Sequence, residues 1–212
     1  MGPFDNTDES LLRSGILSDC EITCDGKTWK VHKSILCTRS GYFKGLLMKN
    51  WKESKENKAE ITLFNKEQIG WLIKYLYRGS VYFRPFEKAG TVLYTCAQLW
   101  HLGDYFLVPS LCDKVRRYIR FSVIPKTEPL AKRQGWVIDG PDWLKAGQFV
   151  YDHFYRRGNS FCDAFLDMSL EKTFVRKQVL NLPQFKQLCK EWPDFGNDCM
   201  TKLVESKVTR LQ

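Results

Sequence analysis

The stretch that decides the fold runs from Ser18 to Lys49, and residues 18–37 of it read SDCEITCDGKTWKVHKSILC. Apolar and polar residues alternate over 20–24 and again over 27–31, with Asp25-Gly26 between the two runs. Asp-Gly between two alternating runs predicts a β-hairpin. From residue 32 the apolar residues change to helical spacing, so we expect the hairpin to lead directly into helices. No Gly-rich phosphate loop stands at this junction, which argues against a nucleotide site.

The size and composition of the chain indicate a globular protein. It has 212 residues, of which 43% are hydrophobic and 14% aromatic, enough for one large domain or a domain with a substantial extension. No apolar run approaches the roughly 18 residues of a membrane span. The N-terminus carries Asp5, Asp8 and Glu9 and has no apolar signal core. We therefore expect an intracellular protein of the nucleus, the cytoplasm or both, without membrane contact.

The eight cysteines are spread along the chain without paired CxxC spacing, so they are interpreted as reduced, mostly buried thiols. Cys20 and Cys24, with His32 and Cys37 downstream, are the nearest approach to a metal cluster. Cys20 and Cys24 would share one strand face with Ile22, where core residues belong. We expect no metal site and no cofactor.

Charge and the pattern of reactive residues exclude two further function classes. The chain has 33 Lys and Arg against 24 Asp and Glu, and this excess of positive charge is spread along the sequence. Neither a DNA-recognition helix nor the ligand spacing of a zinc finger is present in the sequence pattern. Nucleic-acid binding is therefore not expected. The sequence shows no pattern typical of a nucleophile–base pair or a carboxylate cluster, and His101 and His153 fall on apolar helical faces. We expect no catalytic residues and no enzymatic activity.

The first half of the chain predicts further elements around the hairpin. Glu9–Ile16 has the spacing of a short helix, and Lys49–Lys58 is polar and is expected to form a surface loop. Ala59–Phe64 alternates like a strand. A capping-box signal at Asn65 then opens a helix that Gly79 ends.

Helices dominate the prediction for the rest of the chain. A short β-like segment at 81–83 precedes a helix from about Glu87 to Leu102, which Gly103 is expected to break. Pro109 starts the next helix, and Pro125 closes this part. A Pro- and Gly-rich connector follows, and helical spacing resumes at Ala146 and continues to the end.

Six short motifs follow one another in the order of a known family. They are Ser18-Asp19, Val31-His32-Lys33-Ser34-Ile35-Leu36, Arg39-Ser40-Gly41-Tyr42-Phe43, Ile61-Thr62-Leu63, Leu76-Tyr77-Arg78-Gly79 and Gly103-Asp104-Tyr105-Phe106-Leu107-Val108-Pro109-Ser110-Leu111. Over about residues 16–122 the chain resembles a BTB/POZ domain, and its helix–helix stretch is most similar to fungal members. The resemblance implies an α+β fold, a small β-sheet packed against a helical cluster, here followed by an all-helical C-terminal extension.

We expect four parts along the chain. Residues 1–15 would be an N-terminal segment with a short helix, 16–124 the BTB/POZ domain, 125–145 a connector and 146–212 a helical extension. The extension is compatible with the three-box or BACK-type segments of some family members. The resemblance also implies a protein-interaction domain that commonly forms homodimers through the helix before the first strand. In this chain the residues of that interface would be Leu11, Leu12, Ile16 and Leu17.

Three polar residues of the opening stretch are expected to be structural. His32 stands at the strand-to-helix junction, where an imidazole can satisfy backbone groups that a helix start leaves unpaired. Asp19 resembles a partly buried carboxylate stabilised by backbone donors or by Lys33. In zinc-finger relatives, positions matching Asp19 and Lys33 line a charged pocket at the dimer interface that recruits corepressors. For this chain we favour the structural role alone.

Many family members are substrate adaptors for cullin-3 ubiquitin ligases and carry a hydrophobic-x-Glu motif in the loop after the second helix pair. Trp51-Lys52-Glu53 fits that motif. The resemblance places Phe106 where adaptors often present an aromatic residue to the cullin, with Asp104 just before it. We therefore take Trp51, Glu53, Asp104 and Phe106 as candidate cullin-binding residues. The alternative for Trp51 is that its ring folds back on its own domain.

Two function classes remain for the whole chain. The first is a substrate adaptor for a cullin-3 type ligase that works through a homodimerising BTB domain. The second is an oligomeric scaffold or transcription-associated regulator without a ligase role. No zinc-finger, kelch or MATH-like sequence is present, so an adaptor would have to recruit its unknown client through residues 126–212. Trp136, Trp143 and Tyr151 are the expected surface residues there.

Overall fold

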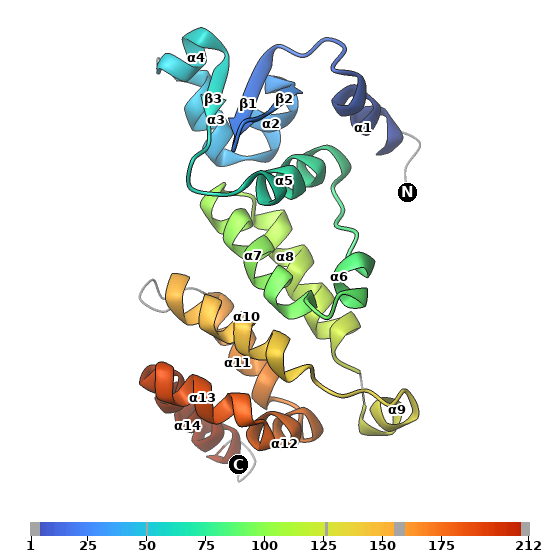
Figure 1. The fold of residues 1–212 in the computed structure, drawn as a ribbon, viewed down its shortest axis with the longest axis vertical. Coiled ribbons are helices and arrows are strands. Elements are labelled where there is room, and N and C mark those ends of the chain that lie inside the picture. Colours follow the sequence, from blue (N-terminus) through green and yellow to red (C-terminus); the bar gives the residue numbers. More distant parts are fainter. Residues whose placement is uncertain (1–4, 50, 126, 155–159, 209–212) are drawn as a thin grey trace. The chain divides into compact units, whose positions relative to one another are not determined.

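The computed structural model describes residues 5–49, 51–125, 127–154 and 160–208 of the chain (Figure 1). It divides into two compact units, which we describe separately. The first comprises Met1–Tyr82 and Leu99–Lys114, and the second comprises Phe83–Gln98 and Val115–Gln212. Among the described residues, no helix is both long and apolar enough to cross a membrane.

A three-stranded sheet forms in the first unit, and its hairpin is the one predicted. β1 (Cys20–Cys24) pairs antiparallel with β2 (Lys27–Val31), with Cys20 opposite Val31. The turn residues Asp25 and Gly26 have φ angles of 47° and 71°. Positive φ at both central residues is what a tight hairpin turn of the type I′ class requires, so Asp-Gly fixes the register. Cys20, Ile22 and Cys24 are buried, as alternation along β1 predicts.

β3 (Lys58–Glu60) pairs in parallel with β1, which gives the strand order β2-β1-β3. This strand begins one residue before the predicted Ala59–Phe64 and ends four residues earlier. The predicted loop over Lys49–Lys58 also contains one short helix, α4 (Lys52–Glu56). Asn57 ends α4 with a φ of 56°, a left-handed conformation that asparagine tolerates, and so turns the chain into β3.

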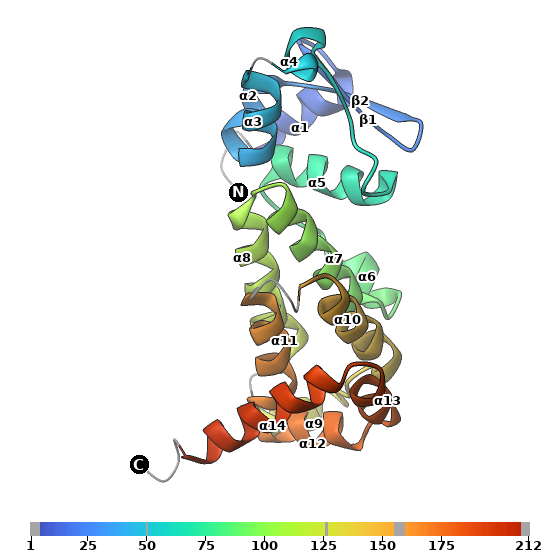
Figure 2. The same cartoon turned by 90° about the vertical axis from the view of Figure 1, so that its left-hand side faces the viewer.

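Helices cover the sheet of the first unit. They include α1 (Asp5–Ser14), α2 (Lys33–Arg39), α3 (Gly41–Met48) and α5 (Lys66–Arg78). The predicted capping box opens α5: the Gln68 N–H donates to Asn65 Oδ1 at 2.9 Å, and the Asn65 N–H donates to Gln68 Oε1 at 3.1 Å. Gly79 ends it with a φ of 67°. α1 and α2 both pack on α5 (Figure 2).

The prediction that Gly103 breaks a helix is wrong. α7 (Val92–Tyr105) runs through Gly103, and α8 (Pro109–Tyr118) begins at the predicted proline. A Cβ added at Gly103 would lie 2.7 Å from Cys112 Sγ, so this glycine is needed for a close approach between α7 and α8. The β-like segment predicted at 81–83 forms no strand among the described residues. Phe83 is instead the N-cap of the short helix α6 (Arg84–Lys88).

The second unit contains helices and no strand among its described residues, as predicted for the C-terminal half. A π-helical turn (Ile119–Val123) is followed by α9 (Glu128–Arg133), α10 (Gly140–His153), α11 (Ser160–Leu170), α12 (Thr173–Asn181), α13 (Pro183–Glu191) and α14 (Pro193–Val208). α10 packs on α11 and α13, and α14 packs on α11 and α13 (Figures 1 and 2). Thus α9 and the first turns of α10 fall within the segment expected to be a connector.

Trp143 lies at the centre of this helical unit. It is fully buried, and its ring lies 5.6 Å from that of Phe165 and 5.8 Å from that of Phe195, between centroids. Its indole N–H donates to Ser169 Oγ at 3.0 Å, which satisfies the one polar atom of the side chain. Gly147, one turn further along α10, lets Leu188 and Phe165 approach closely: a Cβ there would lie 2.5 Å from Leu188 Cδ2.

Candidate protein-interaction surface

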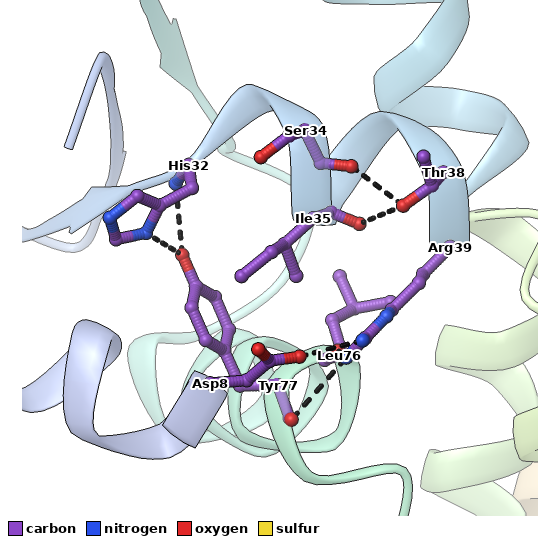
Figure 3. A network of polar contacts seen from close by, with 8 residues as sticks. All are labelled: Asp8, His32, Ser34, Ile35, Thr38, Arg39, Leu76 and Tyr77. Atoms are coloured by element: carbon purple, nitrogen blue, oxygen red, sulfur yellow. Dashed lines mark hydrogen bonds and ion pairs between the residues drawn. The ribbon is translucent and has the colours of Figure 1, made fainter. Parts of the chain in front are cut away.

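His32 is a structural residue of the first unit. Its own N–H donates to the Tyr77 hydroxyl at 2.9 Å, and its ring Nδ1 lies 2.7 Å from the same hydroxyl (Figure 3). Ring Nε2 lies 2.8 Å from the carbonyl oxygen of Ile16. A carbonyl only accepts, so Nε2 carries the proton and Nδ1 accepts from Tyr77. The imidazole therefore joins α5 to the segment before β1. It makes no cap for α2 itself.

Arg39 ties α1 to α5 in the same network (Figure 3). Its Nη1 donates to the Leu76 carbonyl oxygen at 2.5 Å, at the C-terminal end of α5, and its Nη2 donates to Asp8 Oδ2 at 2.6 Å. A second pair, Glu9 with Arg78, adds a two-pronged contact between the same two helices. This contact holds the pKa of Glu9 below its ordinary value. Residues of α1 are thus held against their own unit.

The four predicted dimer residues differ in exposure. Leu11 and Leu12 are half-buried, since they lie on α1, which packs on α5. Ile16 and Leu17 are 62% and 82% exposed. Leu17 has a φ of 61°, an unusual conformation for a leucine that turns the chain from α1 toward β1. Of the four predicted dimer residues, Ile16 and Leu17 are therefore the two that are exposed enough to contact another molecule.

Of the two alternatives expected for Asp19, backbone donors or the Lys33 side chain, the structure shows a backbone donor. Asp19 is exposed, and its Oδ1 accepts from the backbone N–H of Lys33 at 2.8 Å. The Lys33 ammonium group donates to Asn57 Oδ1 at the end of α4. The expected backbone donor for Asp19 is therefore present, whereas the expected burial is not. Lys33 links α2 to the loop before β3.

Trp51 and Glu53 lie together at the start of α4. Trp51 is the N-cap residue of α4 and is 58% exposed, so its ring does not fold back into the core. Glu53 is half-buried in the first turn of the helix. Burial raises the pKa of Tyr42 on α3, the neighbouring Tyr105 raises it further, and the charge of Glu53 is the smallest cause. Trp51 and Glu53 thus place an exposed indole and a carboxylate two residues apart at the start of one helix.

Phe106 is not on the surface, which corrects the prediction for this residue. Its side chain is 0% exposed and packs against four aromatic rings at centroid distances of 4.9–5.4 Å, namely those of Tyr42, Phe43, Phe64 and Tyr105. Asp104, two residues earlier on α7, is exposed. The half-buried neighbour Tyr105 reaches the surface in place of Phe106.

Backbone bonds join the start of α3 to the loop between α7 and α8. The Gly41 N–H donates to the Leu107 carbonyl oxygen at 3.2 Å, and the Tyr42 N–H donates to that of Phe106 at 3.3 Å. The Ser40 hydroxyl donates to the Phe106 carbonyl oxygen at 2.7 Å and accepts from the Phe43 N–H at 3.2 Å. Two segments that lie 66 residues apart in sequence are thereby held together.

This contact reveals residues that the sequence analysis missed. The rings of Tyr42 and Tyr105 lie 5.5 Å apart, so Tyr105 packs beside α3, and Asp104 precedes it on α7. Beside them, a hollow of about 1210 Å³ is lined by Met48 and Leu107, which are both exposed, among other residues. We call Trp51, Glu53, Tyr42, Tyr105 and Asp104 the α3–α4 surface. A predicted helix that continued through Gly103 to Tyr105 would have identified Tyr105 as a residue near this surface.

Two of the three aromatic residues expected to recruit a client lie in the core of the second unit. Trp143 and Tyr151 are buried, and Trp136 is half-buried. The hydroxyl of Tyr151 donates to Asp198 Oδ2 at 2.8 Å, which explains how its polar end is satisfied inside the unit. Trp143 and Tyr151 therefore stabilise α10 against its neighbours and cannot form a contact surface.

The order of hairpin, helix pair and short third strand, with His32 at the junction, agrees with a single family. A family model described as the BTB/POZ domain matches residues 9–122. This chain belongs to the BTB/POZ family. The family is a non-enzymatic protein–protein interaction domain, and the α+β fold inferred from the six motifs is confirmed. The likeness to fungal members stays a prediction, as do the boundaries of the four expected parts.

Curated relatives of this BTB/POZ protein include the Germ cell-less proteins. Germ cell-less protein-like 1 of Homo sapiens is 30% identical over 92 residues, a match that covers 42% of this chain and 18% of that protein. The Mus musculus counterpart is 30% identical, and Germ cell-less protein-like 2 of Homo sapiens is 29% identical, with 17% of each covered. The match thus spans under a fifth of the length of these relatives.

Two solved structures that this chain matches are BTB domains. The BTB domain of zebrafish PATZ1 is 14% identical with a TM-score of 0.44, and the match covers 55% of this chain and 88% of that one. The BTB domain of human Gigaxonin is 17% identical with a TM-score of 0.43, covering 56% of this chain and 93% of that one.

Proposed function

We propose that this BTB protein is a substrate adaptor of a cullin-3 type ubiquitin ligase and binds the cullin through the α3–α4 surface. The observation that carries the proposal is that Trp51 stands exposed at the start of α4, with Glu53 in the first turn of the same helix. An exposed indole supplies buried area on binding, and a neighbouring carboxylate supplies orientation. Inside the cell, where such ligases work, the chain would act in the nucleus, the cytoplasm or both.

Replacing Trp51 with alanine is expected to weaken binding of the purified chain to a cullin-3 N-terminal domain by at least about 30-fold. Central tryptophans of an interface commonly contribute about 2 kcal/mol or more, and each 1.4 kcal/mol is tenfold. Glu53→Ala should weaken binding by a smaller factor. Isothermal titration calorimetry on the full chain measures both effects.

Tyr82→Ala is the matched control, because Tyr82 is an aromatic residue of the same unit that is 65% exposed but lies outside the α3–α4 surface. This variant should bind like the unsubstituted chain. If Trp51→Ala and Glu53→Ala leave the affinity unchanged, the α3–α4 surface is not the contact. If the unsubstituted chain does not bind the cullin domain, the scaffold or transcription-associated class becomes the better description.

We also propose a homodimer in which Ile16 and Leu17 provide the apolar contact. The double variant Ile16→Ala with Leu17→Gly is expected to shift the dimer dissociation constant by at least about 100-fold, since each fully buried Leu or Ile contributes about 1.5–3 kcal/mol. Glycine suits the φ of 61° at Leu17, so the fold of the protomer should persist. Light scattering across a concentration series measures the shift; an unchanged dimer would place the interface elsewhere.

In this proposal, residues 126–212 recruit the client protein. A test of this role needs point variants, because deleting this segment would remove Asp142. The carboxylate of Asp142 accepts from the backbone N–H groups of Leu93 and Tyr94 at 2.7 and 3.0 Å. Without it the first turn of α7 would lose its cap within the second unit. A truncation would therefore change the fold as well as any client surface.

A further inference from the structure

A cleft of about 590 Å³ on the second unit combines aromatic rings with carboxylates. Its rings come from three places: Tyr94 at the start of α7, Phe149 and His153 on α10, and Trp192 between α13 and α14. Its acids are Asp152 on α10 and Glu191 at the end of α13. All four ring side chains are half-buried. We call these six residues the aromatic–acidic cleft.

The rings are held in fixed mutual orientations. Tyr94 and Phe149 meet edge to face, with centroids 5.7 Å apart and ring planes at 83°, and His153 stacks on Phe149 at 4.0 Å. The backbone N–H of Tyr94 donates to Asp142 on α10, which fixes the start of α7 beside Phe149. The backbone N–H of Trp192 donates to Leu188 at 2.8 Å, which fixes the junction that carries the indole. The cleft is therefore largely formed before any ligand arrives.

Glu191 brings a negative charge that its described hydrogen-bond partners do not neutralise. Its Oε2 accepts from the Gln148 amide at 2.6 Å, and its Oε1 accepts from the Gln187 amide at 2.8 Å. These two donors hold the pKa of Glu191 below its ordinary value, so the carboxylate stays ionised at neutral pH. Both amides are uncharged and therefore orient the carboxylate without cancelling its charge.

Charge decides which kind of ligand suits the cleft. Asp152 is exposed and adds a second carboxylate, 3.7 Å from Nδ1 of His153, and Lys145 is the one lysine or arginine among the described residues that line the cleft. The faces of aromatic rings attract cations, and an anion or a purely apolar ligand would gain nothing from the two acids. We propose that the aromatic–acidic cleft binds a lysine side chain from a basic segment of a partner protein.

The inserted ammonium group would lie against the rings of Tyr94, Phe149 and Trp192, with Glu191 and Asp152 as the countercharges at the rim. This inference does not rest on the cullin proposal, because the α3–α4 surface belongs to the first unit and the cleft to the second. A chain that fails to bind a cullin can still bind a basic peptide here, and the reverse also holds.

The test uses the full chain and two probe peptides. One is an acetylated, amidated heptapeptide of alternating glycine and lysine, and the other carries glutamine in place of each lysine. Titration followed by ¹H–¹⁵N NMR should show saturable shifts with the lysine peptide at Tyr94, Phe149 and the Trp192 indole. The glutamine peptide should cause none. Absence of shifts with the lysine peptide up to about 10 mM, or equal shifts with both peptides, would overturn the proposal.

Variants separate this site from general attraction to acidic side chains. Glu191→Gln and Phe149→Leu should each weaken binding of the lysine peptide by about threefold or more, and Lys145→Ala should tighten it by about twofold. Glu171→Gln removes one exposed acid of the same unit outside the cleft and should leave the affinity unchanged. If Glu171→Gln weakens binding as much as Glu191→Gln does, the peptide binds through overall charge and the cleft is not its site.

Discussion

Replacing Phe106 with alanine is expected to lower the free energy of unfolding by about 3–5 kcal/mol. Phe106 is completely buried, and the rings of Tyr42, Phe43, Phe64 and Tyr105 surround it. Truncation would leave a cavity that four rigid rings cannot fill by small movements. Urea unfolding followed by circular dichroism measures the loss, and hydrogen exchange should rise in α3, whose first N–H groups bond to this segment.

Leu107→Gly provides the control for this prediction. Leu107 is adjacent in sequence, but its side chain is exposed and its φ is 52°, which glycine adopts without strain. We expect this variant to change the free energy of unfolding by no more than about 0.5 kcal/mol. If Phe106→Ala were equally mild, Phe106 would not belong to the core, and its earlier interpretation as a surface contact would be restored.

Local sequence signals predicted the parts of the fold that depend on neighbouring residues. The Asp25-Gly26 turn sets the hairpin register, and Asn65 with Gln68 opens α5, because each of these contacts closes within a few residues. The family motifs supplied the order of these elements. Together they gave the α+β fold and placed Trp51 and Glu53 in one loop, while the exposure of the Trp51 ring became clear only in the structure.

Contacts between distant segments explain what the sequence could not show. Glycine is typical of helix ends, but Gly103 lies inside α7, where its lack of a side chain lets Cys112 pack closely against the helix. That shift of the helix end puts Tyr105 at the surface and Phe106 in the core. Trp143 and Tyr151 were expected to help recruit a client because the sequence contains no zinc-finger, kelch or MATH-like module that could do so. They are buried because α10 packs against α11, α13 and α14 through side chains with no signature in the local sequence.

Replacing Asp142 with alanine is expected to cost about 2–4 kcal/mol of unfolding free energy in the second unit. The carboxylate is only 3% exposed, and its two oxygens accept separately from the N–H groups of Tyr94 and Leu93. Both donors belong to the first turn of α7 and have no partner within that helix. Alanine would leave both without an acceptor. Hydrogen exchange at these two amides, together with urea unfolding, measures the loss.

Asp142→Asn and Asp152→Ala divide this effect into its parts. Asparagine keeps one acceptor oxygen and should cost about half as much as alanine. Asp152 is an exposed acid on the same helix, so its loss should stay within about 0.5 kcal/mol. A loss from Asp152→Ala equal to that from Asp142→Ala would mean that the charge of α10 matters and the cap does not.

The pH dependence gives Asp142 a further signature. Burial raises the pKa of Asp142 above its ordinary value of 3.8, and it outweighs the two backbone donors, which act in the opposite direction. A carboxyl whose pKa is higher in the folded state binds its proton more tightly there. Its contribution to the free energy of unfolding therefore falls as the pH rises from 3.8 through the folded-state pKa. Asp142→Asn should remove this fall; if the pH profiles of both proteins coincide, Asp142 titrates alike in the folded and unfolded states.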